Sequence, residues 1–272
     1  MNNKLILTRL IEKAYEREGF ISALIFGSQG IGKTSYALRV AKQVYSSWHK
    51  ALDYLFFNPK EAIKRLWTAL EKGERLKLII LDDAGLWLGK SQWWHREKLE
   101  FAEFFDIIRT VCSAVIFTTP ADNLLSRLSH EIQLRIKVNP IDSELYSQLK
   151  KQGYNVDVDT WRVAKIYRFS LSPLFQPIIK KQAYDIFPLY YPNEIKALYD
   201  KKRREAVKAK LDRVKQSLKL DEAIIVNRAN LDELILQLLE QGYSKSEIAR
   251  KLGISRATVY NRLKKLSKSS NL

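Results

Sequence analysis

An eight-residue segment near the N-terminus has the residue types and spacing of a phosphate-binding loop. It runs Gly27-Ser28-Gln29-Gly30-Ile31-Gly32-Lys33-Thr34, which fits GxxxxGK[ST], and Ser35 follows it. Glycines let the backbone wrap around a phosphate, so that N–H groups and the start of the next helix face the anion. Lys33 can then reach the β- and γ-phosphates, and the Thr34 hydroxyl can hold Mg²⁺. Residues 27–35 therefore predict a site for ATP and Mg²⁺.

Two adjacent aspartates supply candidate acids for the same site. The apolar run Leu78–Leu81 ends directly in Asp82 and Asp83. A buried strand that ends in a carboxylate would place Asp82 beside the phosphate loop, where it can hold Mg²⁺ directly or through water. Asp83 can orient and deprotonate the attacking water. A plain turn after a strand is the alternative interpretation of this pair.

A hydroxyl pair and two arginines are further candidates. The apolar segment Ala114–Thr119 ends in Thr118 and Thr119, and either hydroxyl could sense the γ-phosphate; Thr119 is included among the catalytic candidates. Arg127 follows Leu124-Leu125-Ser126 on a predicted short helix. It is a candidate finger, an arginine that a neighbouring subunit lends to stabilise charge on the transferred phosphoryl group, with Arg135 as the alternate. A surface arginine is the simpler alternative.

The elements that must position these residues alternate along the first 140 residues. Short apolar strands separated by helical patterns indicate a parallel sheet of about five strands, covered by helices on both faces. Strands are expected at Ile21–Phe26, Leu52–Phe57, Leu78–Leu81, Ala114–Phe117 and Ile132–Val138, and helices at Lys33–Ser46, Lys60–Glu71, Arg96–Val111 and Asp122–Ser129. The predicted fold class is α/β, with the parallel sheet of a P-loop NTPase. In that sheet the strand Ala114–Phe117 is expected between Ile21–Phe26, the loop strand, and Leu78–Leu81, the acid strand.

The pattern changes after Pro140. A helix at Ser143–Gly153 precedes two strands, Trp161–Ser170 and Phe175–Phe187, which predict an appended β-hairpin. Asn193–Leu220 lacks proline and glycine and predicts one long basic helix, followed by a linker at Asp221–Asn230. The expected organisation is an ATPase domain at 1–192 (core 1–140, hairpin extension 141–192), a basic helix and linker at 193–230, and a small domain at 231–272.

Residues 231–272 have helix-turn-helix spacing. Helices are expected at Asp232–Gln241, from the Ser244 capping box to Gly253, and at Arg256–Leu266, around a core of Leu234, Leu238, Ile248, Ala249, Leu252, Ile254, Val259 and Leu263. The third helix would lie in the major groove of double-stranded DNA. Candidate base contacts are Ser255, Arg256, Thr258, Tyr260 and Asn261, and Lys264, Lys265 and Lys268 could meet phosphates. A helical protein-binding module of the same shape is the alternative.

Composition narrows the partners and the compartment. There are 47 Lys+Arg against 30 Asp+Glu, so the net charge is +17 and a polyanionic partner is expected. Nucleic acid is the simplest such partner, and an anionic membrane surface is the rival. Cys112 is the single cysteine, so an internal disulfide is excluded, and with three histidines no zinc cluster is expected. The N-terminus reads as an amphipathic helix rather than a signal peptide. The sequence predicts a cytoplasmic protein without a membrane partner.

Some motifs leave alternatives open. Asp82–Gly85 also matches the DxxG of regulatory GTPases, although an NKxD-type guanine motif is missing near Thr118-Thr119-Pro120-Ala121-Asp122. A small-molecule kinase would fit the double acid and the basic appendages poorly. Trp87, Trp93, Trp94 and His95 could stack on single-stranded bases or pack against a neighbouring element. The basic helix could follow a phosphate backbone or be a solvated charged face.

Taken together, these motifs resemble the AAA+ branch of P-loop ATPases. The resemblance rests on GSQGIGKTS, LIILDDAG, the TT strand end and LLSR. The double aspartate resembles the motif found at this position in the bacterial initiator DnaA, the helicase loader DnaC and IstB-type transposition ATPases. The opening GFISALIFGSQGIGKTSYALRVAKQVY more closely resembles the DnaA-like ATPases of archaeal spindle-shaped viruses and related plasmids. This family resemblance implies that Lys33 and Thr34 bind the nucleotide and Mg²⁺ and that Asp82 binds the metal. It further implies that Asp83 holds the attacking water and that Arg127 is the arginine finger.

The resemblance covers about residues 1–140 and continues faintly to about 205 through FPLYYPNEI. After residue 140 the sequence departs from the AAA+ pattern, since a helical lid and a sensor-2 arginine motif are not evident, which puts a closed ring in question. The segment GYSKSEIARKLGISRATVYNRLKKL resembles the DNA-binding domains of resolvases, invertases and transposases.

The function that the sequence predicts is that of an ATPase with a DNA-reading tail. The expected role is replication initiation, helicase loading or DNA remodelling for a mobile element, as a homo-oligomer and with a replication or packaging protein as a further partner. A DNA-packaging or transposition motor would share every motif. A transcription regulator in which ATP is a switch is the third class.

Overall fold

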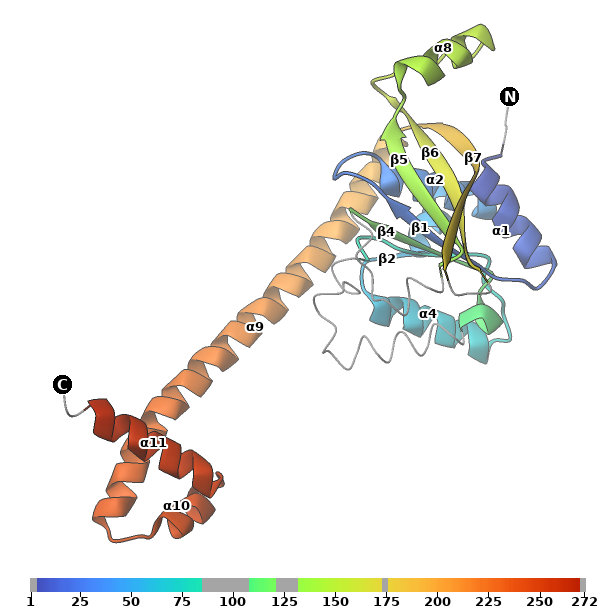
Figure 1. Cartoon of the computed structure of the whole chain (residues 1–272). Helices are drawn as coiled ribbons and strands as arrows, with labels where there is room; N and C mark the ends of the chain where they lie inside the picture. The colour runs from blue at the N-terminus through green and yellow to red at the C-terminus, as the bar shows by residue number, and fades with distance from the viewer. Residues whose placement is uncertain (1–3, 85–107, 121–131, 173–175, 270–272) are drawn as a thin grey trace. The chain divides into compact units, whose positions relative to one another are not determined.

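A central sheet of seven strands organises residues 1–206 of the computed structural model (Figure 1). The structure describes residues 4–84, 108–120, 132–172 and 176–269, and for 213–214, 216–230 and 267–269 it describes the backbone alone. The strands follow the order β2-β3-β4-β1-β5-β6-β7. Their bounds are β1 Ile21–Phe26, β2 Leu55–Phe56, β3 Ile79–Leu81, β4 Ala114–Thr119, β5 Leu134–Pro140, β6 Trp161–Leu171 and β7 Pro177–Pro188.

The first five strands in this order are parallel, and β6 and β7 add to the sheet in antiparallel fashion. β4 lies between β1 and β3, as the sequence predicts, so the loop strand and the acid strand are separated by the strand that ends in Thr118 and Thr119. The α/β fold class is therefore confirmed. The predicted hairpin is part of the same sheet, because Arg162–Arg168 of β6 pair with the whole of β5, Leu134–Pro140.

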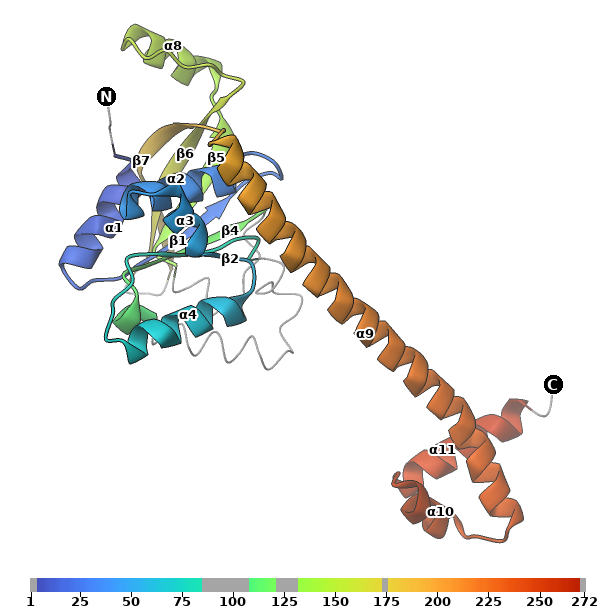
Figure 2. The ribbon, with the colours of Figure 1, turned by 180° about the vertical axis from the view of Figure 1, so that it is seen from behind.

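Helices cover both faces of the sheet. The helices before and between the strands are α1 Ile6–Glu16, α2 Lys33–Tyr45, α3 Trp48–Asp53, α4 Pro59–Glu71 and α8 Ser143–Lys151. One apolar core joins α1, α2 and α3 to the inward residues of β1, β4, β5 and β6. A second core lies on the opposite face, where α4 packs on β2, β3 and β4. Figure 2 shows α1, α2 and α3 grouped on one side and α4 on the other.

Asp185 of β7 fixes the first helix to the sheet. Its buried carboxylate accepts hydrogen bonds from the Ile6 backbone N–H (2.9 and 3.0 Å) and from the Tyr36 hydroxyl (2.6 Å). Burial raises the pKa of Asp185, while these donors oppose the shift. Three distant segments, α1, α2 and β7, are thereby held at one point beside the phosphate loop.

The structure differs from the sequence prediction at two elements. The strand expected at Leu52–Phe57 begins later, because Ser47 caps α3 by accepting from the Lys50 N–H and the helix continues to Asp53. The linker expected at Asp221–Asn230 is helical, since α9 runs from Asn193 to Glu240. No proline or glycine interrupts that stretch, so the sequence holds no helix-breaking signal there.

Residues 207–272 form a second unit. It contains the end of α9, α10 Lys245–Leu252 and α11 Arg256–Ser269. The Ser244–Glu247 capping box opens α10, and Gly253 closes it with a left-handed φ of 64°. The small core centres on Ile235, Ile248, Ala249 and Val259. Leu234, expected in this core, is 43% exposed; Ile235 is the buried residue, since it shares a helix face with Leu231 and Leu238.

Candidate nucleotide-binding site and DNA-binding surface

The phosphate loop connects β1 to α2 and is closely packed by its surroundings. Gly27 and Gly32 both have positive φ values, 148° and 106°. A Cβ atom at Gly27 would lie 2.7 Å from the Val138 carbonyl oxygen, and one at Gly32 would overlap the side chain of Leu189. Glycine is required at Gly27 because the β5 backbone approaches so closely, and at Gly32 because residues with a side chain rarely adopt a φ of 106°. The loop thereby keeps its backbone accessible to a phosphate-sized ligand.

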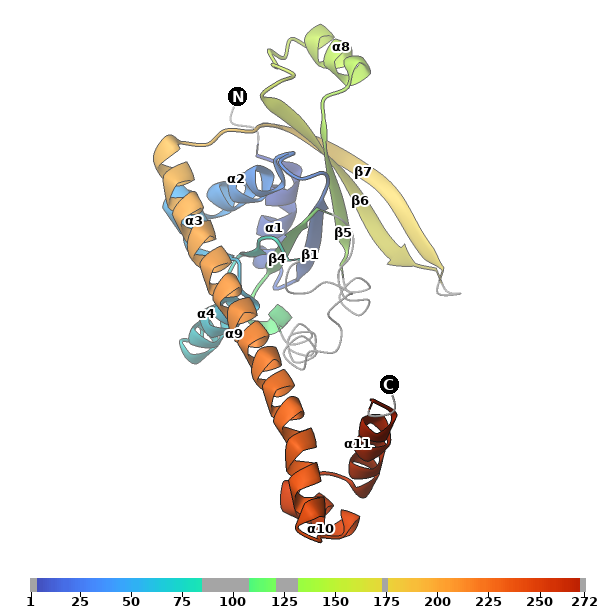
Figure 3. The ribbon, with the colours of Figure 1, turned by 90° about the vertical axis from the view of Figure 1, so that its left-hand side faces the viewer.

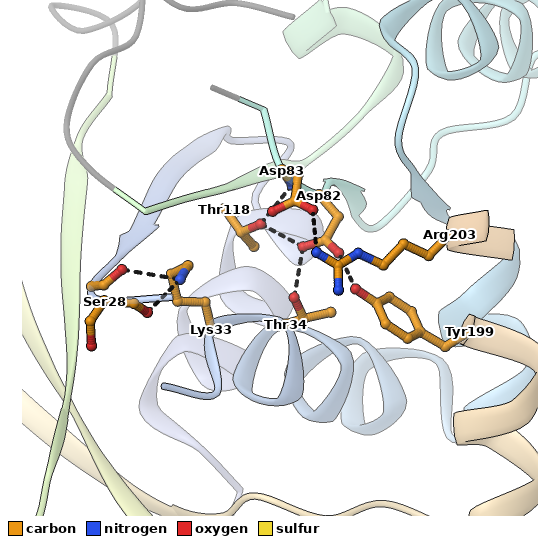
Figure 4. A network of polar contacts seen from close by, with 9 residues as sticks. Ser28, Lys33, Thr34, Asp82, Asp83, Thr118, Tyr199 and Arg203 are labelled. Carbon is orange, nitrogen blue, oxygen red and sulfur yellow. Dashed lines mark hydrogen bonds and ion pairs between the residues drawn. The ribbon is translucent and has the colours of Figure 1, made fainter. Parts of the chain in front are cut away.

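Lys33 is the buried cation of the loop. Its ammonium donates to the carbonyl oxygens of Gly27 (3.0 Å) and Ser28 (2.8 Å), and the residue is 7% exposed (Figure 4). Burial lowers the pKa of Lys33, whereas the nearby Asp83 and Asp82 raise it. The ammonium is thus folded back onto its own loop, where it can exchange carbonyl partners for an anionic one.

Asp82 joins the loop helix to the strand ends. Its Oδ1 accepts from the Thr34 hydroxyl (2.9 Å) and from the Thr118 hydroxyl (2.5 Å). Its Oδ2 accepts from the Tyr199 hydroxyl (2.8 Å). Burial raises the pKa of Asp82, and the hydrogen bonds from Thr118, Tyr199 and Thr34 oppose that rise. Thr34 and Asp82 therefore form an oxygen-donor pair of the kind that Mg²⁺ prefers, and the fit to this metal is good.

Asp83 is placed differently from its neighbour. Its backbone is left-handed (φ 51°), its N–H donates to Thr118 Oγ1 (3.0 Å), and its side chain keeps 23% exposure. The carboxylate forms an ion pair with Arg203, Nη2 to Oδ2 3.2 Å. An acid at this position is accessible to water while Asp82 is not, which suits the two acids to different tasks.

The first turns of α9 complete the site, and sequence reasoning missed them. Tyr199 is buried against Phe57 and Tyr191 and contacts Asp82, and Arg203, four residues later on the same helix face, contacts Asp83. Lys202 donates to the carbonyl oxygens of Leu52 and Leu55. Figure 4 shows Tyr199 and Arg203 reaching the two acids from one side, Thr118 from the other and Thr34 from below.

The remaining predicted site residues have different positions. Thr118, rather than Thr119, is hydrogen-bonded to both acids; Thr119 is buried at the end of β4, opposite Phe26 of β1. Arg135 lies on β5 with its guanidinium 4.6 Å from the Phe169 ring centroid. Arg127, Gly85 and the Trp87–His95 cluster lie outside the described residues. Among the parts that are described, no group of three His, Cys, Asp or Glu side chains is arranged to hold a metal.

The candidate DNA-binding residues lie on or before α11. Arg256, Tyr260, Asn261, Lys264 and Lys265 are exposed, and Tyr260 reaches 58%. Ser255 and Thr258 instead cap the helix: their hydroxyls are 2.7 Å apart, and Ser255 Oγ accepts from the Thr258 N–H (3.0 Å). An Arg262–Asp232 ion pair (2.6 Å) fixes α11 to the end of α9. Lys268 lies among the residues whose side chains are not described.

Comparisons with known proteins identify the C-terminal module most directly. Residues 227–268 match the family model of the helix-turn-helix domain of resolvase. This agrees with the three-helix arrangement at the end of α9, α10 and α11.

Two curated relatives come from viruses. "Uncharacterized protein B-251" of Sulfolobus spindle-shape virus 1 is 44% identical over 130 residues, which cover 45% of this chain and 52% of the relative. "Uncharacterized protein ORF286" of Acidianus two-tailed virus is 30% identical over 166 residues, covering 59% of this chain and 57% of the relative. The chain thus matches a little over half the length of these relatives. The first relative comes from a spindle-shaped virus, the group of viruses that the sequence resemblance indicates. Neither relative's name describes a replication initiator.

Solved structures give weak similarities. The genome packaging NTPase B204 from Sulfolobus turreted icosahedral virus 2, in complex with AMP, aligns with a TM-score of 0.34 at 13% identity, over 60% of this chain and 98% of that chain. The N-terminal domain of zonular occludens toxin from Neisseria meningitidis aligns with a TM-score of 0.36 at 10% identity, over 61% and 95%. Similarities this low do not assign a function.

The described helices include none with the length and apolar character of a membrane span.

Proposed function

We propose that the chain is an ATP-hydrolysing, DNA-binding protein of a mobile element. The observation that carries the proposal is the junction of Thr34, Asp82 and Thr118, where the phosphate loop meets two strand ends through hydrogen bonds of 2.9 and 2.5 Å. Asp83 lies next to this junction with an accessible carboxylate. Loop, metal-ligand pair and candidate base are thus gathered at the carboxyl ends of parallel strands, where ligands of open α/β sheets bind.

Each residue has a role in the proposed reaction. Lys33 would exchange the Gly27 and Ser28 carbonyls for phosphate oxygens, and Thr34 and Asp82 would hold Mg²⁺, which supplies charge neutralisation along the triphosphate. Asp83 would accept the proton of a water whose oxygen attacks the γ-phosphorus, while the bond to the β-phosphate oxygen breaks to give ADP and phosphate. Tyr199 remains a hydrogen-bond donor that positions Asp82, since burial, and then Asp82 itself, raises its pKa.

Arg203 must change partner during such a reaction. The Arg203 guanidinium lies 3.2 Å from Asp83 Oδ2, so a water can use this oxygen as its proton acceptor only when Arg203 has moved away. A bound magnesium–triphosphate would add net negative charge beside Lys33 and Arg203, which favours that exchange. In this proposal the start of α9 responds to nucleotide.

The second unit would read double-stranded DNA through α11. Its match to the resolvase helix-turn-helix model and the exposure of Arg256, Tyr260 and Asn261 support this assignment. Replication initiation, helicase loading or DNA remodelling in the cytoplasm of the host is the favoured role, with a replication or packaging protein as a further partner. A packaging or transposition motor is the second candidate and an ATP-switched transcription regulator the third.

Phosphate release, measured with ATP and GTP, with and without Mg²⁺ and duplex DNA, tests the proposal. ATP hydrolysis that depends on Mg²⁺ and is lost in Lys33→Ala is the expected result; preference for GTP would revive the GTPase alternative. Strand opening on DNA then indicates the initiator role. Length-dependent translocation indicates the motor, and slow hydrolysis with tight promoter binding indicates the switch.

Arg127 is proposed to act across a subunit boundary in a homo-oligomer. The test mixes Arg127→Ala chains with Lys33→Ala chains, each inactive alone. Recovery of hydrolysis supports a shared site, because each chain supplies what the other lacks. Failure to recover activity at every mixing ratio, with mixed oligomers verified, counts against it.

A further inference from the structure

The β6–β7 hairpin concentrates positive charge, and its one acidic residue, Asp185, is buried and accepts hydrogen bonds from Ile6 and Tyr36. Residues 161–184, here called the basic hairpin, contain Arg162, Lys165, Arg168, Lys180 and Lys181, and no Asp or Glu. The nucleotide site does not use these residues. A segment of a packed sheet with cations alone on it suggests that an anion is part of its environment when the protein works.

The strand register places like charges directly opposite one another. Lys137 of β5 is the cross-strand partner of Lys165, and Arg168 of β6 is the partner of Lys180. Directly opposed like charges destabilise a sheet. Lys165 is offset by Asp142, 3.7 Å away, but the described residues hold no ion pair for Arg168 or Lys180. The hairpin therefore keeps an unfavourable charge pair that folding does not require.

The cations in the half of the hairpin that is farther from Trp161 are exposed to solvent, where an anionic ligand can reach them. Arg168, Lys180 and Lys181 are all exposed, as is Lys137 of the adjacent strand. Arg162 is different, because its guanidinium donates to the carbonyl oxygens of Val158, Asp159 and Trp161. The surface available to a ligand thus lies toward the tip of the hairpin.

The distal hairpin is a ribbon of two strands. Pairing with β5 ends at Leu134 opposite Arg168, whereas β6 and β7 stay paired out to Leu171 and Pro177. A bulge between Ile166 and Tyr167 shifts the register shortly before this part, since Tyr167 still pairs with Arg135 of β5. Figure 3 shows β6 and β7 continuing together past the end of β5. A two-stranded ribbon has the width that a DNA groove admits, and the Arg168–Lys180 pair lies at the base of this one.

We propose that the basic hairpin is a second DNA-contacting surface, which binds duplex phosphates through Arg168, Lys180 and Lys181 independently of sequence. Phosphate contact is favoured over stacking on bases, because Tyr167 and Phe169 are half-buried and Phe169 packs against the Arg135 guanidinium. The inference rests on the DNA-binding part of the proposed function. It adds a contact on the nucleotide-binding unit, at the end of the sheet away from the phosphate loop, because Arg168 lies opposite Leu134 at the start of β5. DNA would thus be held by the sheet as well as by α11.

The test compares two triple variants of the full chain in duplex DNA binding across a range of salt concentrations. Arg168→Thr with Lys180→Thr and Lys181→Thr removes the surface while keeping a residue suited to strands. Lys13→Ala with Lys64→Ala and Lys72→Ala removes the same charge from exposed positions on and beside helices α1 and α4. The hairpin variant should bind at least tenfold more weakly than the control variant, and its salt slope should fall by about 2–3, at about 0.9 per lost phosphate contact.

A stability readout separates this inference from loss of folding. Removing the opposed Arg168–Lys180 pair should leave the Tm unchanged or higher while DNA affinity falls. Equal affinity of the two triple variants overturns the inference, as does a hairpin variant that loses only binding to vesicles of anionic lipid. Arg256→Ala with Tyr260→Ala should instead lose sequence discrimination and keep the hairpin-dependent binding. Absence of any DNA binding by the parent chain at low salt would overturn the proposed function as well.

Discussion

Lys33 and Asp82 of the candidate nucleotide site are buried and held by several partners, whereas Arg256 and Tyr260 of α11 are exposed to solvent. In the first region one carboxylate accepts hydrogen bonds from Thr34, Thr118 and Tyr199, so four elements of the fold depend on it. In the second region, a small core and two caps fix the helix, and Arg256 and Tyr260 lie exposed on its surface. Substitutions in the first region should therefore act cooperatively, and those in the second should add independently.

Lys33→Ala should produce the largest effect. The phosphates lose a charged partner in a site from which water is mostly excluded, a loss of about 3 kcal/mol. We expect nucleotide affinity to fall by about 100-fold or more. Equilibrium binding of a fluorescent ATP analogue measures this, and Lys42→Ala on the same helix is the control. Affinity within about threefold of the parent would disprove the assignment of the loop.

Asp83→Asn separates chemistry from binding within the buried site. The amide keeps the shape of the side chain but cannot accept the proton of the attacking water. Turnover should fall by about 10²–10⁴-fold while nucleotide affinity changes little. Steady-state phosphate release combined with equilibrium binding gives both quantities, and Glu74→Gln is a matched exposed control. Hydrolysis at the parental rate would show that Asp83 is not the base.

Tyr199→Phe probes the cooperative network with the loss of a single hydroxyl. Asp82 would keep its contacts to Thr34 and Thr118 but lose the partner of Oδ2. The Mg²⁺ concentration for half-maximal activity should rise about five- to tenfold, equivalent to about 1 kcal/mol. Tyr190→Phe is the control, since Tyr190 is 67% exposed. An identical Mg²⁺ dependence in both variants would mean that Tyr199 does not position the acid.

Substitutions on α11 should have graded and separable effects. Arg256→Ala should reduce discrimination between DNA sites by about 1–3 kcal/mol if its guanidinium pairs with a guanine. Lys264→Ala with Lys265→Ala should weaken binding to all sequences alike and flatten the salt dependence. Competition binding with specific and random duplexes measures both. Strong coupling between the two sets would contradict the additive behaviour expected of an exposed surface.

The pH dependence of Mg²⁺ binding should report the environment of Asp82. Burial raises the pKa of this carboxyl above that of an ordinary aspartate, so it takes up a proton at a higher pH. Metal ligation requires the ionised form, and Mg²⁺-dependent nucleotide affinity should therefore decline on acidification before an ordinary aspartate would titrate. Titrating affinity at stepwise lower pH tests this. A decline only in the range of exposed aspartates would show that the acid is better solvated than the structure indicates.

Local sequence predicted the elements whose function is contained in a short segment. The loop at 27–34 and the helix-turn-helix at 231–266 each carry their glycines, caps and apolar spacing within a few residues, so both could be located before the structure. The prediction that Leu234 is a core residue was wrong, because Leu234 and Ile235 are adjacent and equally apolar and Ile235 is the buried one. Their assignment depends on the face that α10 and α11 cover.

Contacts between distant segments could not be predicted in the same way. Tyr199 and Arg203 appeared in the sequence as part of a basic helix, and their attachment to Asp82 and Asp83 depends on how α9 packs after the hairpin. The difference between Thr118 and Thr119 has a similar origin. Alternate residues of a strand face opposite sides, and the register of β4 against β1 and β3 decides which hydroxyl meets the acids.

The attachment of α9 to the acids also limits how this protein can be recombined. Consider a chimaera in which the C-terminal part of this chain is replaced by that of another protein. If the two sequences are joined before Asn193, Tyr199, Lys202 and Arg203 are replaced together with the helix-turn-helix, and both acids lose their partners on α9. A junction after Ala206, where the two units divide, would leave those contacts intact. Chimaeras that carry a different DNA reader should therefore retain nucleotide chemistry only when the parental helix is kept through Ala206. Natural exchanges of the C-terminal helix-turn-helix among relatives of this chain should have their breakpoints on that side as well.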